Sequence, residues 1–257
     1  TGGNARWNTP TVYPDDMAYI TIDEGKPTER TVPYLVRLET GTINRGIYQS
    51  AMLHDPLNEG PIGPDKRSKA WNGKLIYPLG GGCQGGWYTQ GGTFSTLIVD
   101  EWMKQGYAAV TSTLNIFGSN CNDLLSSETV AMTKERFIEA YGVPVYTIGT
   151  GGSGGAYQSF QTSDNYPGLF DGIIVNSVFP DVTSATLFKL FDSRLLNNYF
   201  NRPGGLAYTD EKKKAISGYL QVGNISAMST SAGRLDPVLS FPSGFPEELK
   251  YHPVDRP

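Results

Sequence analysis

A cluster of glycines around one serine, in residues 143–157 (VPVYTIGTGGSGGAY), constrains the fold more than any other feature of this chain. The apolar, β-branched run before the cluster predicts a strand, and a helical pattern begins directly after it. Gly151, Ser153 and Gly155 fit G-x-S-x-G, in which a tight strand-to-helix turn presents a serine hydroxyl above a sheet. Side chains beside the serine would clash in such a turn, so glycine is needed on both sides. The pattern predicts an α/β sheet that carries a nucleophilic serine.

The same residues allow two other interpretations. Gly149, Gly151 and Gly154 also fit G-x-G-x-x-G, the turn of dinucleotide-binding folds. That turn requires an acidic residue at the end of the next strand. The nearby acid, Asp171, instead lies at the beginning of the strand predicted at 172–177. The third interpretation is a purely structural glycine turn between a strand and a helix.

Composition restricts the classes of partner. Of the 257 residues 18 % are charged and the net charge is −4, which disfavours binding to nucleic acid or to an anionic membrane. No apolar run approaches the roughly 20 residues that span a bilayer. Two histidines and two separated cysteines form no cluster of metal ligands. We therefore expect no metal and no cofactor.

Alternating strand and helix patterns predict the remainder of the sheet. Strands are expected at 32–39, 46–54, 74–79, 107–114, 143–149 and 172–177, with helices at 94–105, 124–141 and 155–165. Such alternation is typical of a mostly parallel sheet covered by helices. The predicted fold class is α/β, with an α/β-hydrolase-like sheet.

Three regions are expected along the chain. Residues 1–30 should form an extended arm, residues 31–180 the core with its six strands, and residues 181–257 a helical cap region with a proline-rich tail. Helical patterns at 182–200 and 209–220 predict a partial cap after the sixth strand, lying over the serine.

Ser153 requires donors that stabilise an oxyanion. In this architecture one donor is the backbone N–H after the nucleophile, here that of Gly154. The second comes from the loop after the third strand, which here reads GGGCQGG and offers Gly81, Gly82 and Cys83. The alternative for this loop is a plain flexible turn.

A base for Ser153 is difficult to find in the sequence. The expected chain order is serine, acid, histidine. His54 precedes the serine and is expected to be a structural or surface residue, whereas His252 follows it but lies in the proline-rich tail. Asp181 follows the sixth strand, so Asp181 and His252 are weak candidates for acid and base. Because both groups normally follow later strands, we expect them on a missing segment or a companion chain.

The two cysteines are informative about the cellular compartment of the protein. Cys83 and Cys121 each follow a predicted strand at what should be the same sheet edge, so they are expected to pair; the alternative is two buried thiols. A disulfide would indicate an oxidising compartment. The chain begins at Thr1 with no signal-like apolar stretch, which indicates either a removed leader or part of a longer polypeptide.

Several segments resemble the tannase and feruloyl-esterase-like α/β-hydrolases, and more closely a large bacterial family of secreted relatives of unknown function. They are RLETGTINRGIYQ (37–49), WNGKLIYPLGGGCQGG (71–86), NIFGSNCND (115–123), ETVAMTKERFIEAYG (128–142), GGSGGAYQ (151–158), DNYPGLFDGIIV (164–175) and SVFPDV (177–182). Residues 235–257 resemble an internal piece of that family. The resemblance covers most of this chain but part of a full-length member.

The resemblance implies a secreted or periplasmic carboxylic-ester hydrolase that acts on a small-molecule or polymer ester through an acyl-serine at Ser153. One position departs from tannases, which usually carry a cysteine directly before the serine; here that residue is Gly152. The runner-up function is a non-catalytic binding or structural subunit that retains the fold. A dinucleotide-binding oxidoreductase is a distant third.

Overall fold

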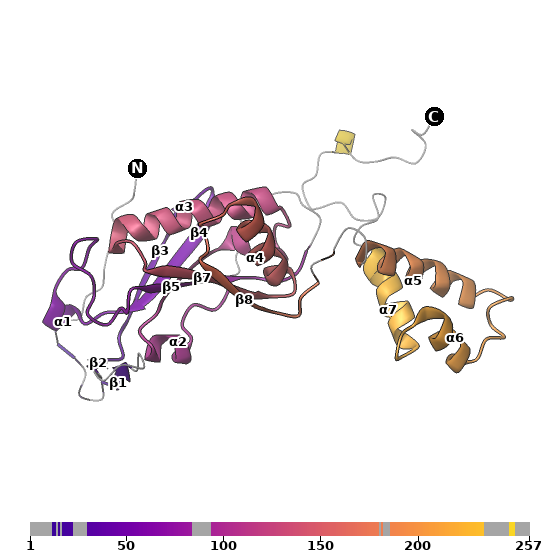
Figure 1. Cartoon of the computed structure of the whole chain (residues 1–257), viewed down its shortest axis with the longest axis horizontal. Helices are drawn as coiled ribbons and strands as arrows, with labels where there is room; N and C mark the ends of the chain where they lie inside the picture. The colour runs from indigo at the N-terminus through magenta and orange to yellow at the C-terminus, as the bar shows by residue number, and fades with distance from the viewer. Residues whose placement is uncertain are drawn as a thin grey trace. The chain divides into compact units, whose positions relative to one another are not determined.

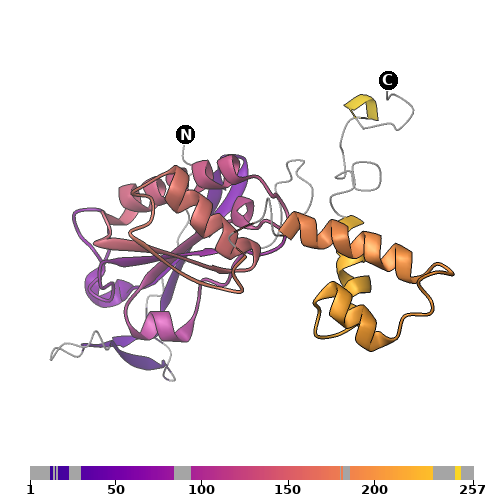
Figure 2. The ribbon, with the colours of Figure 1, turned by 45° about the vertical axis from the view of Figure 1, so that its right-hand side comes forward.

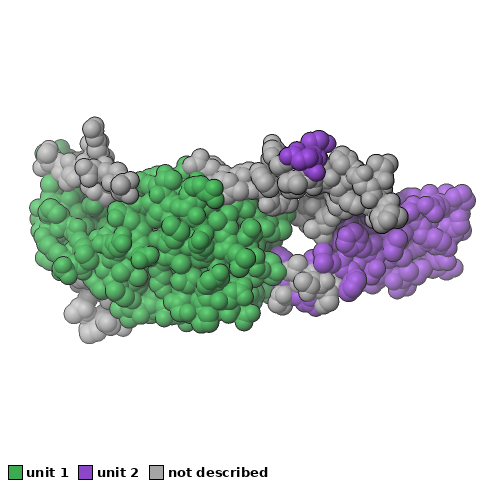
Figure 3. Space-filling model, turned by 90° about the horizontal axis from the view of Figure 1, so that it is seen from above, with its two compact units in different colours: residues 1–83, 88–178 green, residues 84–87, 179–257 purple. Residues whose placement is uncertain are grey.

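The structure is a computed structural model that describes residues 12–13, 15, 17–22, 30–83, 94–179, 181, 186–233 and 247–249 (Figure 1). The chain divides into two compact units, coloured separately in Figure 3. The first unit comprises Thr1–Cys83 and Tyr88–Val178, and the second comprises Gln84–Trp87 and Phe179–Pro257. The strands described below belong to the first unit, and helices α5–α7 belong to the second.

A six-stranded sheet in the order β3-β4-β6-β5-β7-β8 forms the centre of the first unit. Its strands are β3 (Val36–Ile43), β4 (Gly46–Leu53), β5 (Lys74–Leu79), β6 (Ala108–Ser112), β7 (Tyr146–Gly152) and β8 (Gly172–Asn176). β4 pairs antiparallel with β3 and β6, whereas the pairs β5–β6, β5–β7 and β7–β8 are parallel. The sheet is therefore mixed, and the predicted α/β class is confirmed.

Helices cover both faces of this sheet, as Figures 1 and 2 show. α3 (Asp123–Tyr141) and α4 (Gly154–Asn165) lie on one face, and the short α2 (Asp100–Lys104) lies on the other. Asn122 begins α3 by accepting the Leu125 N–H, and Gly142 ends it. The short helix α1 (Pro56–Glu59) and the 3-10 turn η1 (Thr113–Asn115) connect strands.

The buried residues of β5 explain why its sequence reads as a continuous apolar run. Leu75, Tyr77 and Leu79 pack in the cluster that includes Val130 and Phe137 of α3. Successive side chains of a strand point to opposite faces, so a central strand covered on both sides is apolar throughout. β8 is an edge strand and is less covered.

The first unit departs from the sequence predictions at two places. The strand predicted at 32–39 is divided between β2 (Arg30–Pro33), which pairs with β1 (Tyr19–Ile22), and β3. The helix predicted at 94–105 is confined to α2, because residues 94–99 are not helical and Val99 is extended. The β-branched run before Asp100 favours extended backbone.

The second unit consists of α5 (Leu187–Phe200), α6 (Asp210–Ser217) and α7 (Gly223–Ala232). Leu190 and Phe200 of α5 are buried, as are Ile225 and Ala232 of α7, and the two helices pack together. α7 was not predicted, because its residues (GNISAMSTSA) are small and polar and give little helical periodicity. Of the proline-rich tail the structure describes the 3-10 turn η4 (Glu247–Leu249).

Candidate active site

Ser153 occupies a strained turn between β7 and α4. Its φ is 57° and its ψ is −120°, a backbone conformation that residues with a side chain rarely adopt. The residue is exposed. A serine at a helix N-cap ordinarily accepts a hydrogen bond from the first turn, but Ser153 makes no such side-chain bond. Strained residues of this kind cluster at active sites, and this one presents a hydroxyl that does not cap its own helix.

Glycines let the turn press against the end of β5. A Cβ on Gly151 would lie 2.7 Å from the carbonyl oxygen of Leu79, and a Cβ on Gly155 would overlap the same oxygen. Leu79 is the last residue of β5, the neighbouring parallel strand. The two glycines of G-x-S-x-G are therefore required by the close approach of a second strand, in addition to the turn itself.

The loop after β5 lies alongside the segment that follows β6 and is hydrogen-bonded to it. The N–H of Gly80 donates to the carbonyl of Asn115 at 2.8 Å, and the N–H of Gly118 donates to the carbonyl of Gly81 at 2.8 Å. Gly82 has a φ of 96°, and a Cβ there would lie 2.6 Å from the Cα of Gly118. Glycine is thus needed at Gly82 both for its conformation and for the close contact.

This loop also approaches the serine. A Cβ on Gly81 would lie 3.6 Å from the Cβ of Ser153 and 3.7 Å from the backbone nitrogen of Gly154. A Cβ on Gly154 would overlap the carbonyl oxygen of Gly82. The first N–H groups of a helix have no acceptor within the helix and carry partial positive charge. The structure therefore brings Ser153, Gly154, Gly81 and Gly82 together, next to the N-terminus of α4.

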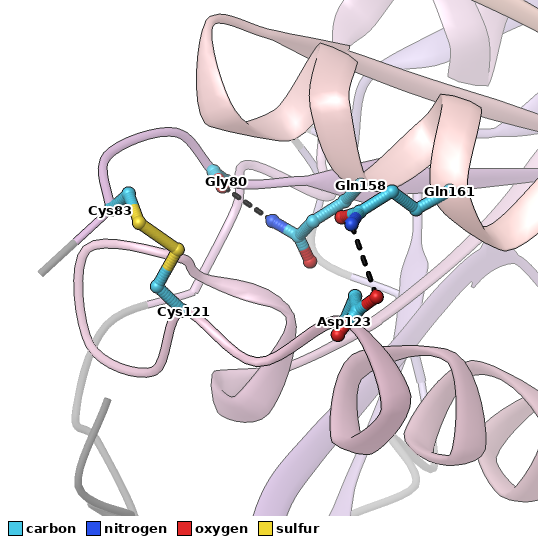
Figure 4. Close-up of a disulfide and its surroundings, with 6 residues drawn as sticks. All are labelled: Gly80, Cys83, Cys121, Asp123, Gln158 and Gln161. Atoms are coloured by element: carbon cyan, nitrogen blue, oxygen red, sulfur yellow. Dashed lines mark hydrogen bonds between the residues drawn. A yellow bond between two sulfur atoms is a disulfide. The ribbon is translucent and has the colours of Figure 1, made fainter. Parts of the chain in front are cut away.

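Cys83 ends the described part of this loop and is joined to Cys121 by a disulfide (Figure 4). The structure thus contains the pairing that the sequence analysis favoured over two free thiols. Cys121 lies just before α3. The bridge connects the glycine loop after β5 to the segment between β6 and α3.

His54 lies at the sheet edge opposite Ser153. It follows β4, whose residue Ala51 pairs with Ala109 near the beginning of β6, whereas Ser153 follows the end of the parallel strand β7. His54 is 4 % exposed, and its Nε2 lies 3.0 Å from the carbonyl oxygen of Gly60. Burial lowers the pKa of His54. Its position excludes it as a base for Ser153 within this unit.

The two weak candidates lie elsewhere in the chain. Asp181 is exposed and belongs to the second unit, where its backbone carbonyl accepts hydrogen bonds from the N–H and the hydroxyl of Thr186. His252 lies outside the described residues. Their assignment as acid and base stays a prediction.

The dinucleotide interpretation lacks its acidic residue in the structure. The carboxylate of Asp171 accepts the N–H of Thr147, near the beginning of β7 and at the edge opposite the glycine turn. The end of β8 carries Asn176, whose carbonyl accepts the N–H of Ser153 at 3.3 Å. No acid therefore occupies the ribose position at the end of β8.

The sequence analysis missed Gln158, a buried residue of α4. Its side-chain nitrogen donates to the carbonyl of Gly80 at 2.7 Å, so it contacts the glycine loop directly (Figure 4). No local pattern marks it, because one polar residue in a helix reads as a solvent-facing position. The contact depends on the tertiary arrangement of α4 and β5.

Tyr157 lies one helical turn after Ser153, and its ring contacts that of Phe117 with 6.3 Å between centroids. Burial and the charge of Asp123 raise the pKa of Tyr157, so its hydroxyl stays protonated at neutral pH.

Two absences can be stated for the part of the chain that the structure describes. Across these residues, no group of three or more His, Cys, Asp or Glu side chains is placed to hold a metal ion. Among the described helices, none is both long enough and apolar enough to cross a membrane.

Comparison with known proteins identifies a family. No curated protein sequence matches the chain. Among solved structures, the glycosylation associate protein (Gap123) complex from Streptococcus agalactiae is similar over 76 % of this chain at 14 % identity, with a TM-score of 0.29. The chain spans 32 % of the length of that protein. The sequence profile of one family matches residues 2–257, and the chain therefore belongs to the tannase-like family of unknown function (DUF6351).

Proposed function

We propose that this chain carries the nucleophile of a carboxylic-ester hydrolase with an α/β-hydrolase fold. The observation that carries the proposal is the strained, exposed backbone turn at Ser153, placed between a parallel strand and a helix. The strand order β3-β4-β6-β5-β7-β8, with β4 antiparallel to both neighbours, supports the fold assignment. The tannase-like family name supports the hydrolase class.

In the proposed reaction the Ser153 oxygen attacks the ester carbonyl carbon while a base accepts the serine proton. The carbonyl oxygen becomes an oxyanion that accepts hydrogen bonds from the N–H of Gly154 and from the loop Gly81–Cys83. Each such donor contributes about 3 kcal/mol to the transition state. The tetrahedral intermediate then expels the alcohol, which takes up the proton, and water hydrolyses the acyl-serine to release the acid.

The base and its acid partner belong, in this proposal, to a further segment or a companion chain, with Asp181 and His252 as the candidates within this sequence. His54, the one histidine among the described residues, lies at the wrong sheet edge. That observation favours the second candidate function, a binding or structural subunit that retains the fold without catalysis.

Two further proposals concern the setting of the enzyme. The disulfide between Cys83 and Cys121 supports a secreted or periplasmic location, because disulfides persist in oxidising compartments. We propose that α5–α7 form a cap region of the hydrolase. Phe188, Phe191 and Leu195 form an exposed apolar row on α5, and such rows mark contact surfaces.

Hydrolysis of nitrophenyl esters of aliphatic and aromatic acids tests the proposal, with the protein purified as its natural polypeptide. We expect turnover that Ser153→Ala abolishes. Ser177→Ala is the matched control, because Ser177 is also exposed, also has a positive φ and follows the neighbouring strand β8. Equal turnover by Ser153→Ala would exclude the acyl-serine mechanism, and no turnover of any ester would favour the non-catalytic subunit.

A further inference from the structure

Gln158 links the helix of Ser153 to the glycine loop after β5. It lies on α4, five residues after the serine, and is 1 % exposed. Its side-chain nitrogen donates to two backbone carbonyls, that of Gly80 at 2.7 Å and that of Asn115 at 3.2 Å. One buried carboxamide thus holds both the end of β5 and the segment that follows β6.

A chain of buried hydrogen bonds fixes the orientation of this carboxamide. The Ser126 hydroxyl donates to Oε1 of Gln158 at 2.6 Å. Asn115 in turn donates to the carbonyl and the hydroxyl oxygen of Ser126, each at 2.9 Å, and accepts the Tyr77 hydroxyl at 2.7 Å. With its oxygen bound to a hydroxyl donor, Gln158 can only direct its NH₂ group at the carbonyls.

The held loop is the one that approaches Ser153. Gly80 precedes Gly81 and Gly82, whose backbone lies against Ser153 and Gly154. An oxyanion donor acts only when it lies about 2.7–3.1 Å from the developing charge, and a displacement of about 1 Å can cost on the order of 100-fold in rate. A restraint on Gly80 therefore affects the position of the oxyanion donors in the proposed reaction.

Gln161 provides a comparison within the same helix. It lies one turn further along α4, and its side-chain nitrogen donates to the carboxylate of Asp123 on α3 at 3.1 Å (Figure 4). Both glutamines connect α4 to a neighbouring segment, Gln158 to the glycine loop and Gln161 to the first residue of α3. Their substitution separates a general contribution to stability from a specific effect on the loop.

We propose that Gln158 is a positioning residue that holds Gly80–Gly82 at the distance from Ser153 that acyl transfer needs. The inference rests on the proposed esterase function. Its consequence is that Gln158 affects the chemical step, through the position of the oxyanion donors, and leaves ground-state binding of the ester nearly unchanged.

The test compares Gln158→Met with Gln161→Met in the natural polypeptide, by the rate of Ser153 phosphonylation with a fluorophosphonate and by kcat and KM for a nitrophenyl ester. We expect Gln158→Met to lower the phosphonylation rate and kcat by about 10- to 100-fold, with KM within roughly threefold. Gln161→Met should stay within roughly threefold of wild type in all three values.

A second variant covers the case in which Gln158→Met does not fold. Ser126→Ala keeps Gln158 but removes the hydroxyl that orients it, and should lower kcat by roughly 3- to 10-fold without raising KM. Suppose that the wild type is labelled and that the folded Gln158→Met and Ser126→Ala variants react at unchanged rates. That result would overturn the positioning role and leave the esterase proposal intact. Wild-type protein that is never phosphonylated would overturn both.

Discussion

Among the single residues of the site, the glycines matter because they lack a Cβ, which lets neighbouring backbone segments approach closely. The turn at Ser153 can form only because Gly151, Gly154 and Gly155 leave room for the end of β5 and for the loop after it. The sequence predicted the tight turn at Ser153 and its flanking glycines, because the G-x-S-x-G pattern is local, whereas the role of Ser153 as a nucleophile stays a prediction. It did not predict Gln158, whose partner Gly80 lies 78 residues away in the chain.

Gly154→Ala tests the packing of this turn. The new methyl group would overlap the Gly82 carbonyl, so the loop must move away from Ser153. We expect a loss of roughly 1–3 kcal/mol in the free energy of unfolding and a fall of more than about tenfold in fluorophosphonate labelling. Gly223→Ala is the control, because nothing lies within 4 Å of the new Cβ. Unchanged labelling in Gly154→Ala would show that the loop position is irrelevant.

Glu39 on β3 is a buried carboxylate that affects stability. Burial raises its pKa, but hydrogen bonds from Tyr141, Tyr48 and Arg136 outweigh burial and hold the pKa of Glu39 below its ordinary value. A lowered pKa in the folded state stabilises the protein above the unfolded-state pKa, and this contribution is lost as the pH falls through the folded-state pKa.

We therefore expect the free energy of unfolding to decline as the pH falls below 4.5, the ordinary pKa of a glutamate. Glu39→Gln should lower it by roughly 1–3 kcal/mol at neutral pH and flatten the decline. Urea denaturation between about pH 3 and about pH 7 measures both effects. Glu139→Gln on α3, where the side chain is exposed, is the control. If stability declines with pH as much in Glu39→Gln as in wild type, groups other than Glu39 cause the decline.

At the scale of elements, strands with strong apolar patterns were predictable and mixed segments were not. The central strand β5 and the long helix α3 were predicted within one residue, because β5 is a buried apolar run and Gly142 marks the end of α3. β7 begins three residues later than the predicted 143–149, because its second half consists mostly of glycines. The helix predicted at 94–105 was wrong over its first half, since its apolar spacing matches both a helix and an extended segment that packs Leu97 under the sheet.

The disulfide provides a prediction at this scale. It closes a sequence separation of 38 residues, and removal of such a crosslink should cost roughly 2–4 kcal/mol by restoring freedom to the unfolded chain. The double variant Cys83→Ser and Cys121→Ser should therefore unfold at lower denaturant concentration and label more slowly at Ser153. Single variants, each with a lone cysteine, should match the double variant. Equal stability in all forms would contradict stabilisation by the disulfide, and equal labelling would show that the bridge does not affect the reaction of Ser153.

At the scale of the whole molecule, the chain combines a sheet unit and a helical unit with separate buried residues. Composition and alternation predicted an α/β region followed by a helical region. The boundary expected near residue 180 rests on the strand pattern, which stops after 172–177, and it stays a prediction.

Ile225→Ala tests whether the helical unit is stabilised separately. Ile225 is 3 % exposed on α7, and its truncation should cost roughly 2–5 kcal/mol. Hydrogen exchange should rise in α5 and α7 and stay unchanged in β5–β7. The matched control is Ile216→Ala on α6, where the side chain is 51 % exposed. Faster exchange in the sheet as well would show that the two units unfold together.

The proposed function requires Ser153 to be a nucleophile, held in a strained turn next to oxyanion donors. Mass spectrometry after incubation with a fluorophosphonate tests it most directly, in the natural polypeptide and in Ser153→Ala. We predict a single phosphonyl adduct, mapped by proteolysis to the peptide that contains Ser153 and absent from the Ser153→Ala variant. Protein that stays unmodified, or an adduct of equal yield in Ser153→Ala, would show that Ser153 is not the nucleophile.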